Sequence, residues 1–200
     1  MHGTLIGAAQ MPPLGMVGAD VPPTVSTKGI AILGSHPATV AMAPFNDDWL
    51  IYTCSPHNIE RRQLPRWDEW FEIPIPVAHK TRGQQYIEAL KDMPLVWMRD
   101  RNAMASFPGA KLYPEDEMKK EFSPFHFTSS IAFIMAKAIK DCERLGVKQI
   151  GLYGIMQASA NEYTYQRPGI QNLIWEANRR GIKVVAPDVS KLFEPPAEDF

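Results

Sequence analysis

The chain has 200 residues, which is long enough for one domain with a substantial hydrophobic core. Hydrophobic residues make up 45% of it and charged residues 22%, as is ordinary for a soluble globular protein. The net charge of −1 excludes a global basic field for nucleic acid or anionic lipid, and no apolar run approaches the ~20 residues that span a bilayer. The N-terminus also lacks a basic stretch followed by a hydrophobic core, so we predict a cytoplasmic protein without a membrane partner.

The first 28 residues mix Gly, Pro, Ala, Met and Thr without periodicity, and the pairs Pro12-Pro13 and Pro22-Pro23 oppose regular structure. We therefore predict a flexible or loosely docked arm over residues 1–28 and a single domain over residues 29–200. Such an arm could also lie across a neighbouring subunit, which makes a homo-oligomer formed through it a further prediction.

Short apolar runs alternate with helical patterns along the domain, and this alternation is typical of a parallel sheet with right-handed crossovers. The fold class that we predict is α/β, a single Rossmann-like, doubly wound and mostly parallel sheet with helices on both faces. The predicted strands cover residues 29–35, 49–54, 70–73, 95–98, 149–153 and 182–186, and the predicted helices cover residues 84–91, 129–145 and 170–180.

The helix over residues 129–145 has the strongest pattern. Apolar side chains recur at steps of three and four, from Ile131 to Leu145. Thr128 or Ser129 can cap its start, and Gly146 suits the left-handed residue that follows its end.

Two predicted strands end in small polar residues. The first runs into Gly34, Ser35 and His36, and the second is followed by Ser55 and Asn58. Because the carboxyl ends of parallel strands meet at one crevice, we expect these loops to contact a phosphate, a ribose or a base. The alternatives are a tight turn at the first loop and Asx or Ser turns at the second.

Three consecutive capping-type residues, Thr128, Ser129 and Ser130, precede the strongest helix. Their hydroxyls and the N–H groups of the helix start can hold a phosphate or a pyrimidine edge. The alternative is capping alone.

A polar and aromatic loop is predicted over residues 161–169, between a buried strand and the last helix. There Tyr163, Tyr165, Gln166 and Arg167 can converge on an anion, because the planar guanidinium fork suits a phosphate and tyrosyl hydroxyls donate to its oxygens. A surface loop whose tyrosines pack on the end of the sheet is the alternative.

A metal site is not predicted. The five histidines and two cysteines show no C-x-x-C or H-x-x-x-H spacing, and Cys54 and Cys142 are expected to be buried thiols in a reducing compartment. Neither a G-x-S-x-G elbow nor a G-x-x-x-x-G-K-[ST] loop is present, which argues against serine hydrolases and P-loop enzymes.

Four segments together resemble known families: Ile-Leu-Gly-Ser-His-Pro, Tyr-Thr-Cys-Ser, Phe-Thr-Ser-Ser-Ile-Ala-Phe and Gln-Ile-Gly-Leu-Tyr-Gly-Ile. They are similar to motifs of the bacterial lipooligosaccharide-type sialyltransferases and of the MptE-like family, which includes hydroxymethylpterin diphosphokinase. The chain also resembles uncharacterised Rossmann-like proteins of tailed phages over most of residues 29–195, which would place it in a phage-infected bacterial cell.

The resemblance implies nucleotide contacts from Gly34, Ser35, Ser129, Ser130 and Gly154. It further makes Tyr163 and Tyr165 candidates for phosphate contact. The chain departs from the sialyltransferase pattern at two places: Met156 stands where the families have an aspartate, and Tyr165-Gln166-Arg167 stand where the general-base histidine would precede the last helix. These departures argue against sialyl transfer.

We therefore predict a nucleotide-binding phage protein, a transferase that uses a nucleotide or a nucleotide-activated donor such as a nucleotide-sugar. Arg167, with the tyrosines, would stabilise the leaving-group charge. The base would be His36, His57 or His126, and the sequence does not choose among them. The alternative is a non-catalytic protein that sequesters nucleotides, or an accessory protein of a virion or its assembly.

Overall fold

The computed structural model describes residues 27–61, 64–74, 83–156, 162–190 and 192–194, without the side chains of residues 162–164. Residues 1–26 of the predicted arm lie outside the described residues, so the arm stays a prediction. Within the described residues, seven strands form one sheet in which every neighbouring pair is parallel. The predicted α/β class is confirmed.

The strand order across the sheet is β5-β4-β3-β2-β1-β6-β7. All six predicted strands are present, whereas the edge strand β5 was not predicted, because its three residues are half-buried or exposed and form no apolar run. The strands are β1 (Gly29–Leu33), β2 (Trp49–Thr53), β3 (Glu69–Glu72), β4 (Val96–Met98), β5 (Ala110–Leu112), β6 (Gln149–Tyr153) and β7 (Lys183–Val185).

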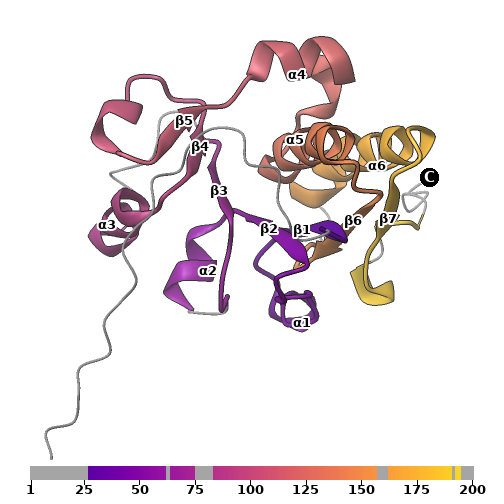
Figure 1. Cartoon of the computed structure of the whole chain (residues 1–200), viewed down its shortest axis with the longest axis horizontal. Helices are drawn as coiled ribbons and strands as arrows, with labels where there is room; N and C mark the ends of the chain where they lie inside the picture. Colours follow the sequence, from indigo (N-terminus) through magenta and orange to yellow (C-terminus); the bar gives the residue numbers. More distant parts are fainter. Residues whose placement is uncertain (1–26, 62–63, 75–82, 157–161, 191, 195–200) are drawn as a thin grey trace, which may run out of the picture.

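The helices cover both faces of the sheet (Figure 1). Side chains alternate along β1, so that Ile30 and Ile32 enter the core under the longest helices while Ala31 and Leu33 enter a smaller core on the opposite face. None of the described helices is long and apolar enough to cross a membrane. The helices are α1 (Pro37–Val40), α2 (Pro56–Glu60), α3 (Gln84–Asp92), α4 (Glu115–Phe122), α5 (Ser130–Leu145) and α6 (Glu162–Arg179), with single turns of 3-10 helix at Met104–Ser106, Pro124–His126 and Asp188–Ser190.

Helix α5 forms as the sequence predicts. The Ser129 hydroxyl accepts a hydrogen bond from the Ala132 amide at 3.3 Å, which makes Ser129 the N-cap, and Gly146 ends the helix with a φ of 71°. The apolar stripe of α5 is buried against the sheet, and this fixes the start of the helix at the carboxyl edge of the strands.

Helix α6 corrects the prediction for residues 161–169. The helix begins at Glu162, so Pro168 lies inside it and not at its first turn. Packing outweighs the cost of an interior proline: the Thr128 hydroxyl donates to the Gln166 carbonyl at 3.2 Å. A Cβ on Gly169 would lie only 2.4 Å from the His126 carbonyl oxygen, so this glycine lets α6 approach the chain before α5.

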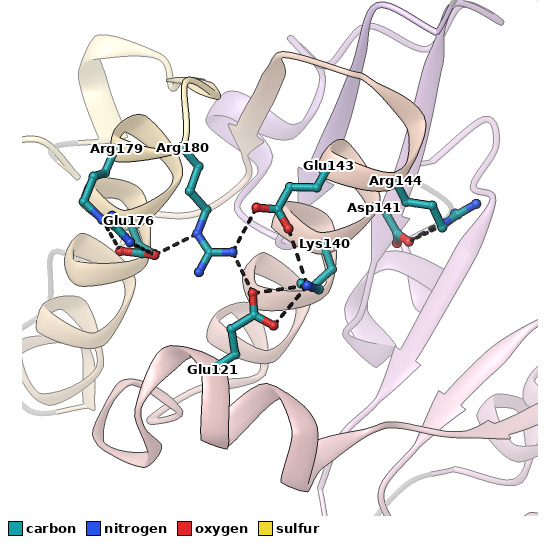
Figure 2. Close-up of polar contacts among 8 residues, drawn as sticks. All are labelled: Glu121, Lys140, Asp141, Glu143, Arg144, Glu176, Arg179 and Arg180. Atoms are coloured by element: carbon teal, nitrogen blue, oxygen red, sulfur yellow. Dashed lines mark hydrogen bonds and ion pairs between the residues drawn. The ribbon is translucent and has the colours of Figure 1, made fainter.

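An ion-pair network joins α4, α5 and the end of α6 (Figure 2). The Arg180 guanidinium contacts Glu121 at 2.7 Å, Glu143 at 3.0 Å and Glu176 at 2.7 Å, and Lys140 contacts Glu121 at 3.0 Å. Because Arg180 binds one carboxylate from each of α4, α5 and α6, the network ties these three helices to one another.

Candidate functional site

A pocket lies at the carboxyl ends of the central strands. Strands β1 and β6 are neighbours, and from β1 the chain builds the sheet toward β2, so the strand order reverses between β1 and β6. In open α/β sheets, ligands bind beside this topological switch point. The pocket has a volume of about 700 Å³, within the range of small-molecule sites. The predicted site residues that line it are Gly34, Ser35, His36, Ser55, His57, Gly154 and Gln166.

The floor of the pocket is made by two glycine turns in backbone contact. The Gly34 amide donates to the Tyr153 carbonyl at 2.8 Å, and the His36 amide donates to the Gly154 carbonyl at 2.9 Å. The Gly154 amide in turn donates to the Thr39 hydroxyl at 2.8 Å. These bonds fasten the loop after β1 to the loop after β6, and the two glycines add no side chain to the floor.

The buried side chain of Asn58 supports the floor of the pocket through contacts with the loops after β1 and β2. Its Nδ2 atom lies 3.0 Å from the Gly34 carbonyl oxygen, 3.0 Å from the Thr53 hydroxyl and 2.8 Å from the Cys54 carbonyl oxygen. The structure thus places Asn58 outside the pocket lining, with its amide holding together the loops after β1 and β2. The ligand contact predicted for Asn58 stays a prediction.

The start of α5 forms part of the pocket wall through Ile131. The Ser129 hydroxyl caps the start of α5, and the Thr128 hydroxyl donates to the main chain of α6. Two of the three predicted hydroxyls therefore make structural contacts, one within α5 and one between the start of α5 and α6. Ser130 is half-buried in the first turn of α5. The N-terminus of this 16-residue helix adds positive potential beside the pocket.

The pocket lining has imidazole and guanidinium side chains besides the neutral Ser35, Ser55 and Gln166. His36, His57 and Arg61 line it, and no carboxylate does so among the described residues. Within the described part of the chain, the Arg61 guanidinium has neither an ion pair nor a hydrogen bond. The arrangement therefore favours an anion.

Arg61 was missed by the sequence interpretation. The signal was its spacing, because residues four apart on a helical turn share one face. The Arg61 amide donates to the His57 carbonyl at 3.0 Å, which continues the turn of α2 by one residue and places both side chains on the pocket.

Several predicted site residues lie elsewhere. The Arg167 guanidinium donates to the Glu194 carbonyl, in the segment after β7, and Arg167 does not line the pocket. Tyr165 is 74% exposed on α6, and His126 is half-buried in the turn before α5. The Tyr163 side chain lies outside the described residues. The roles predicted for these residues stay predictions.

The described residues contain no group of three or more His, Cys, Asp or Glu side chains that could hold a metal ion. Cys54 and Cys142 are both buried, and burial raises the pKa of the Cys142 thiol to about 12. A reactive thiolate at Cys142 is therefore not expected.

No family model and no curated protein matches the chain. Two solved structures are similar, and both are of the sialyltransferase CstII in complex with CMP. In the first, CstII from Campylobacter jejuni with CMP described as a substrate analogue, the TM-score is 0.50 at 17% identity over 80% of this chain and 79% of that one. The second, of a CstII variant, has a TM-score of 0.48 at 14% identity over 80% and 81%.

The chain shares its fold with this transferase. The resemblance read from the sequence motifs is thereby confirmed for the fold of the sialyltransferases. The resemblance to the diphosphokinases and to phage proteins stays a prediction.

Proposed function

We propose that the chain binds a nucleotide in the switch-point pocket and is a transferase that uses a nucleotide-activated donor. The observation that carries the proposal is the lining of the pocket: one arginine and two histidines, with no carboxylate among the described residues. A ligand that fits about 700 Å³ and matches this charge is a nucleotide or a nucleotide-sugar.

The phosphate is assigned to the side of the pocket where His36 and Arg61 lie. An arginine fork binds two oxygens of one phosphate, and hydrogen bonds to ionised partners are stronger than neutral ones. The dipole of α5 adds to the attraction from across the pocket. The Ser55 hydroxyl, on the loop between β2 and α2, supplies a neutral donor on the same side.

The base and sugar are assigned to the apolar side. Ile131, Ile155 and Met156 line it, and Gln166 provides an amide that can both donate and accept. Met156 stands where the resembling families have an aspartate, so this wall carries no negative charge against the ligand.

Transfer would proceed by stabilising the departing nucleoside phosphate. As the bond to the transferred group breaks, negative charge grows on the phosphate oxygen, and a cation already positioned there lowers the barrier. The shared fold supports this proposal, because the structure of CstII similar to this chain holds CMP.

The test is calorimetric titration of the full chain with CMP and with a panel of other nucleoside mono- and diphosphates. Arg61→Ala should weaken binding roughly 10- to 100-fold, the worth of a charged hydrogen bond. Arg101→Ala is the matched control, because Arg101 is an exposed arginine that does not line the pocket. Binding that is equal in the wild type and Arg61→Ala, or absent across the panel, would contradict the proposal. Tight binding without any turnover would instead favour the sequestering alternative.

A further inference from the structure

Two histidines that line the pocket, His36 and His57, carry the proton of the neutral ring on different nitrogens. His57 Nδ1 lies 3.1 Å from Glu60 Oε2, in the same turn of α2. A carboxylate oxygen only accepts, so Nδ1 of His57 carries the proton and Nε2 keeps its lone pair in the neutral ring.

His36 has the reverse arrangement. It is the N-cap of α1, and its Nδ1 accepts a hydrogen bond from the Ala38 amide at 3.3 Å. The proton of the neutral His36 ring is therefore on Nε2, which can donate to a ligand but cannot accept from one. His126, the third histidine considered as a base, does not line the pocket.

From this difference we propose that His57 is the proton acceptor of the transfer and that Glu60 orients it, while His36 donates to the phosphate. The inference rests on the proposed function and names the residue that would activate the acceptor hydroxyl. It places the base in the turn after β2, in a chain that has no histidine in residues 146–161, directly before the last helix.

The setting of His57 suits this role. Its side chain is 57% exposed, so an acceptor can reach the ring from solvent while the donor occupies the pocket. The charged groups beside it are Glu60, on one side, and Arg61, which lines the pocket with it. Within the described part of the chain, Nε2 of His57 has no hydrogen-bond partner.

The acceptor hydroxyl, or water, loses its proton to Nε2 of His57, and its oxygen forms a bond to the transferred group. The bond between that group and the phosphate oxygen breaks, and its electron pair stays on the nucleoside phosphate, where Arg61 and the Nε2–H of His36 face it. Glu60 is a positioning residue, because it holds the ring of His57 and its tautomer without touching the acceptor.

The tautomers are measurable without any substrate. A long-range ¹H–¹⁵N spectrum of the imidazoles, recorded on the full chain at a pH where both rings are neutral, distinguishes Nδ1–H from Nε2–H. We expect Nδ1–H for His57 and Nε2–H for His36, and we expect Glu60→Gln to weaken the preference of His57 while His36 is unchanged. An Nε2–H tautomer at His57 in the wild type would overturn the assignment, whether or not a nucleotide binds.

Turnover tests the same assignment through the reaction. The release of free nucleotide from CMP-, UDP- and GDP-activated sugars is followed by chromatography, and CMP affinity is measured in parallel. His57→Gln should lower kcat at least 100-fold with the CMP affinity within about 3-fold of wild type, because general bases contribute 10²–10⁴-fold. Glu60→Gln should lower kcat less and leave KM unchanged, and Glu117→Gln, at an exposed glutamate outside the pocket, should behave as wild type.

A His57→Gln variant that keeps the wild-type kcat would overturn the proposal while leaving nucleotide binding intact. Loss of CMP binding together with turnover in His57→Gln would also overturn it, since His57 would then be a binding residue. Where the wild type turns over none of these donors, the imidazole spectrum decides alone, and the titrations with Arg61→Ala decide separately on the proposed function.

Discussion

Gly34 and Gly154 pack backbone against backbone at the floor of the pocket. A Cβ on Gly34 would lie 2.3 Å from the carbonyl oxygen of Gly154, and a Cβ on Gly154 would lie 2.9 Å from the carbonyl carbon of Gly34. Gly154 also has a φ of 66°, which L side chains rarely adopt. The contact between these two turns holds the switch point open for a ligand.

Gly34→Ala should destabilise the fold by roughly 1–3 kcal/mol, the range for overpacking, because the atoms that its Cβ meets belong to the backbone and cannot swing aside. Chemical denaturation measures the loss. Gly83→Ala is the control, since none of the described residues lies within 4 Å of a Cβ there, and its loss should be smaller. Equal stabilities of the two variants would contradict this prediction and show that the backbone at Gly34 and Gly154 can shift to accommodate a methyl group.

Asn58→Asp should be at least as destabilising as Asn58→Ala at neutral pH. The alanine variant leaves buried oxygens without their donor, at roughly 1–3 kcal/mol, and the aspartate variant places a carboxylate against the same oxygens. Urea titrations at pH 7 compare the variants with the wild type. Wild-type stability in Asn58→Asp would mean that the amide is not the brace that its three contacts indicate.

The fold was largely predictable because its signals are local. Buried strands read as apolar runs, and α5 carries a periodic stripe between Ser129 and Gly146. The start of α6 was not predictable, because it depends on Thr128 and Gly169, which meet across the fold. The helix was predicted to start at residue 170, beyond Pro168, because an interior proline is costly, and tertiary packing outweighed this cost.

The position of the site in the fold was predictable from the sequence, but the side chains that line it were less so. Parallel topology brings Gly34, Ser55 and Gly154 to one edge, and each lines the pocket. The direction of a long side chain is not a local property: Arg61 lines the pocket and Arg167 contacts the segment after β7. Residue type alone favoured Arg167.

Arg167→Ala is therefore expected to lower stability and to leave nucleotide affinity within about 3-fold of wild type, far less than the change expected for Arg61→Ala. The measurement is calorimetric titration of both variants under the same conditions. A larger loss of affinity in Arg167→Ala than in Arg61→Ala would indicate that Arg167 binds the phosphate, as the sequence suggested.

Stability should fall in acid as the network of Figure 2 is protonated. Hydrogen bonds from Arg179, and then from Arg180, lower the pKa of Glu176 from 4.5 to about 2. A carboxyl whose pKa is lower in the folded state stabilises the fold above its unfolded pKa, and this contribution is lost as the pH falls from about 4.5 toward 2.

Glu176→Gln should therefore be less stable than the wild type at pH 7, and the difference should shrink below pH 4.5. Denaturant titrations between pH 7 and pH 3 measure it. Glu117→Gln is the control, because Glu117 is exposed and has no ion pair among the described residues. A difference that stays constant over this range would show that Glu176 contributes no acid-labile stability.

The most direct test of the central claim is a crystal structure of the full chain grown with CMP, or with whichever nucleotide binds most tightly in titrations. We predict the nucleotide in the pocket above Gly34 and Gly154, with a phosphate oxygen within about 2.7–3.2 Å of the Arg61 guanidinium. A nucleotide bound elsewhere, or a pocket that stays empty at saturating nucleotide, would contradict it.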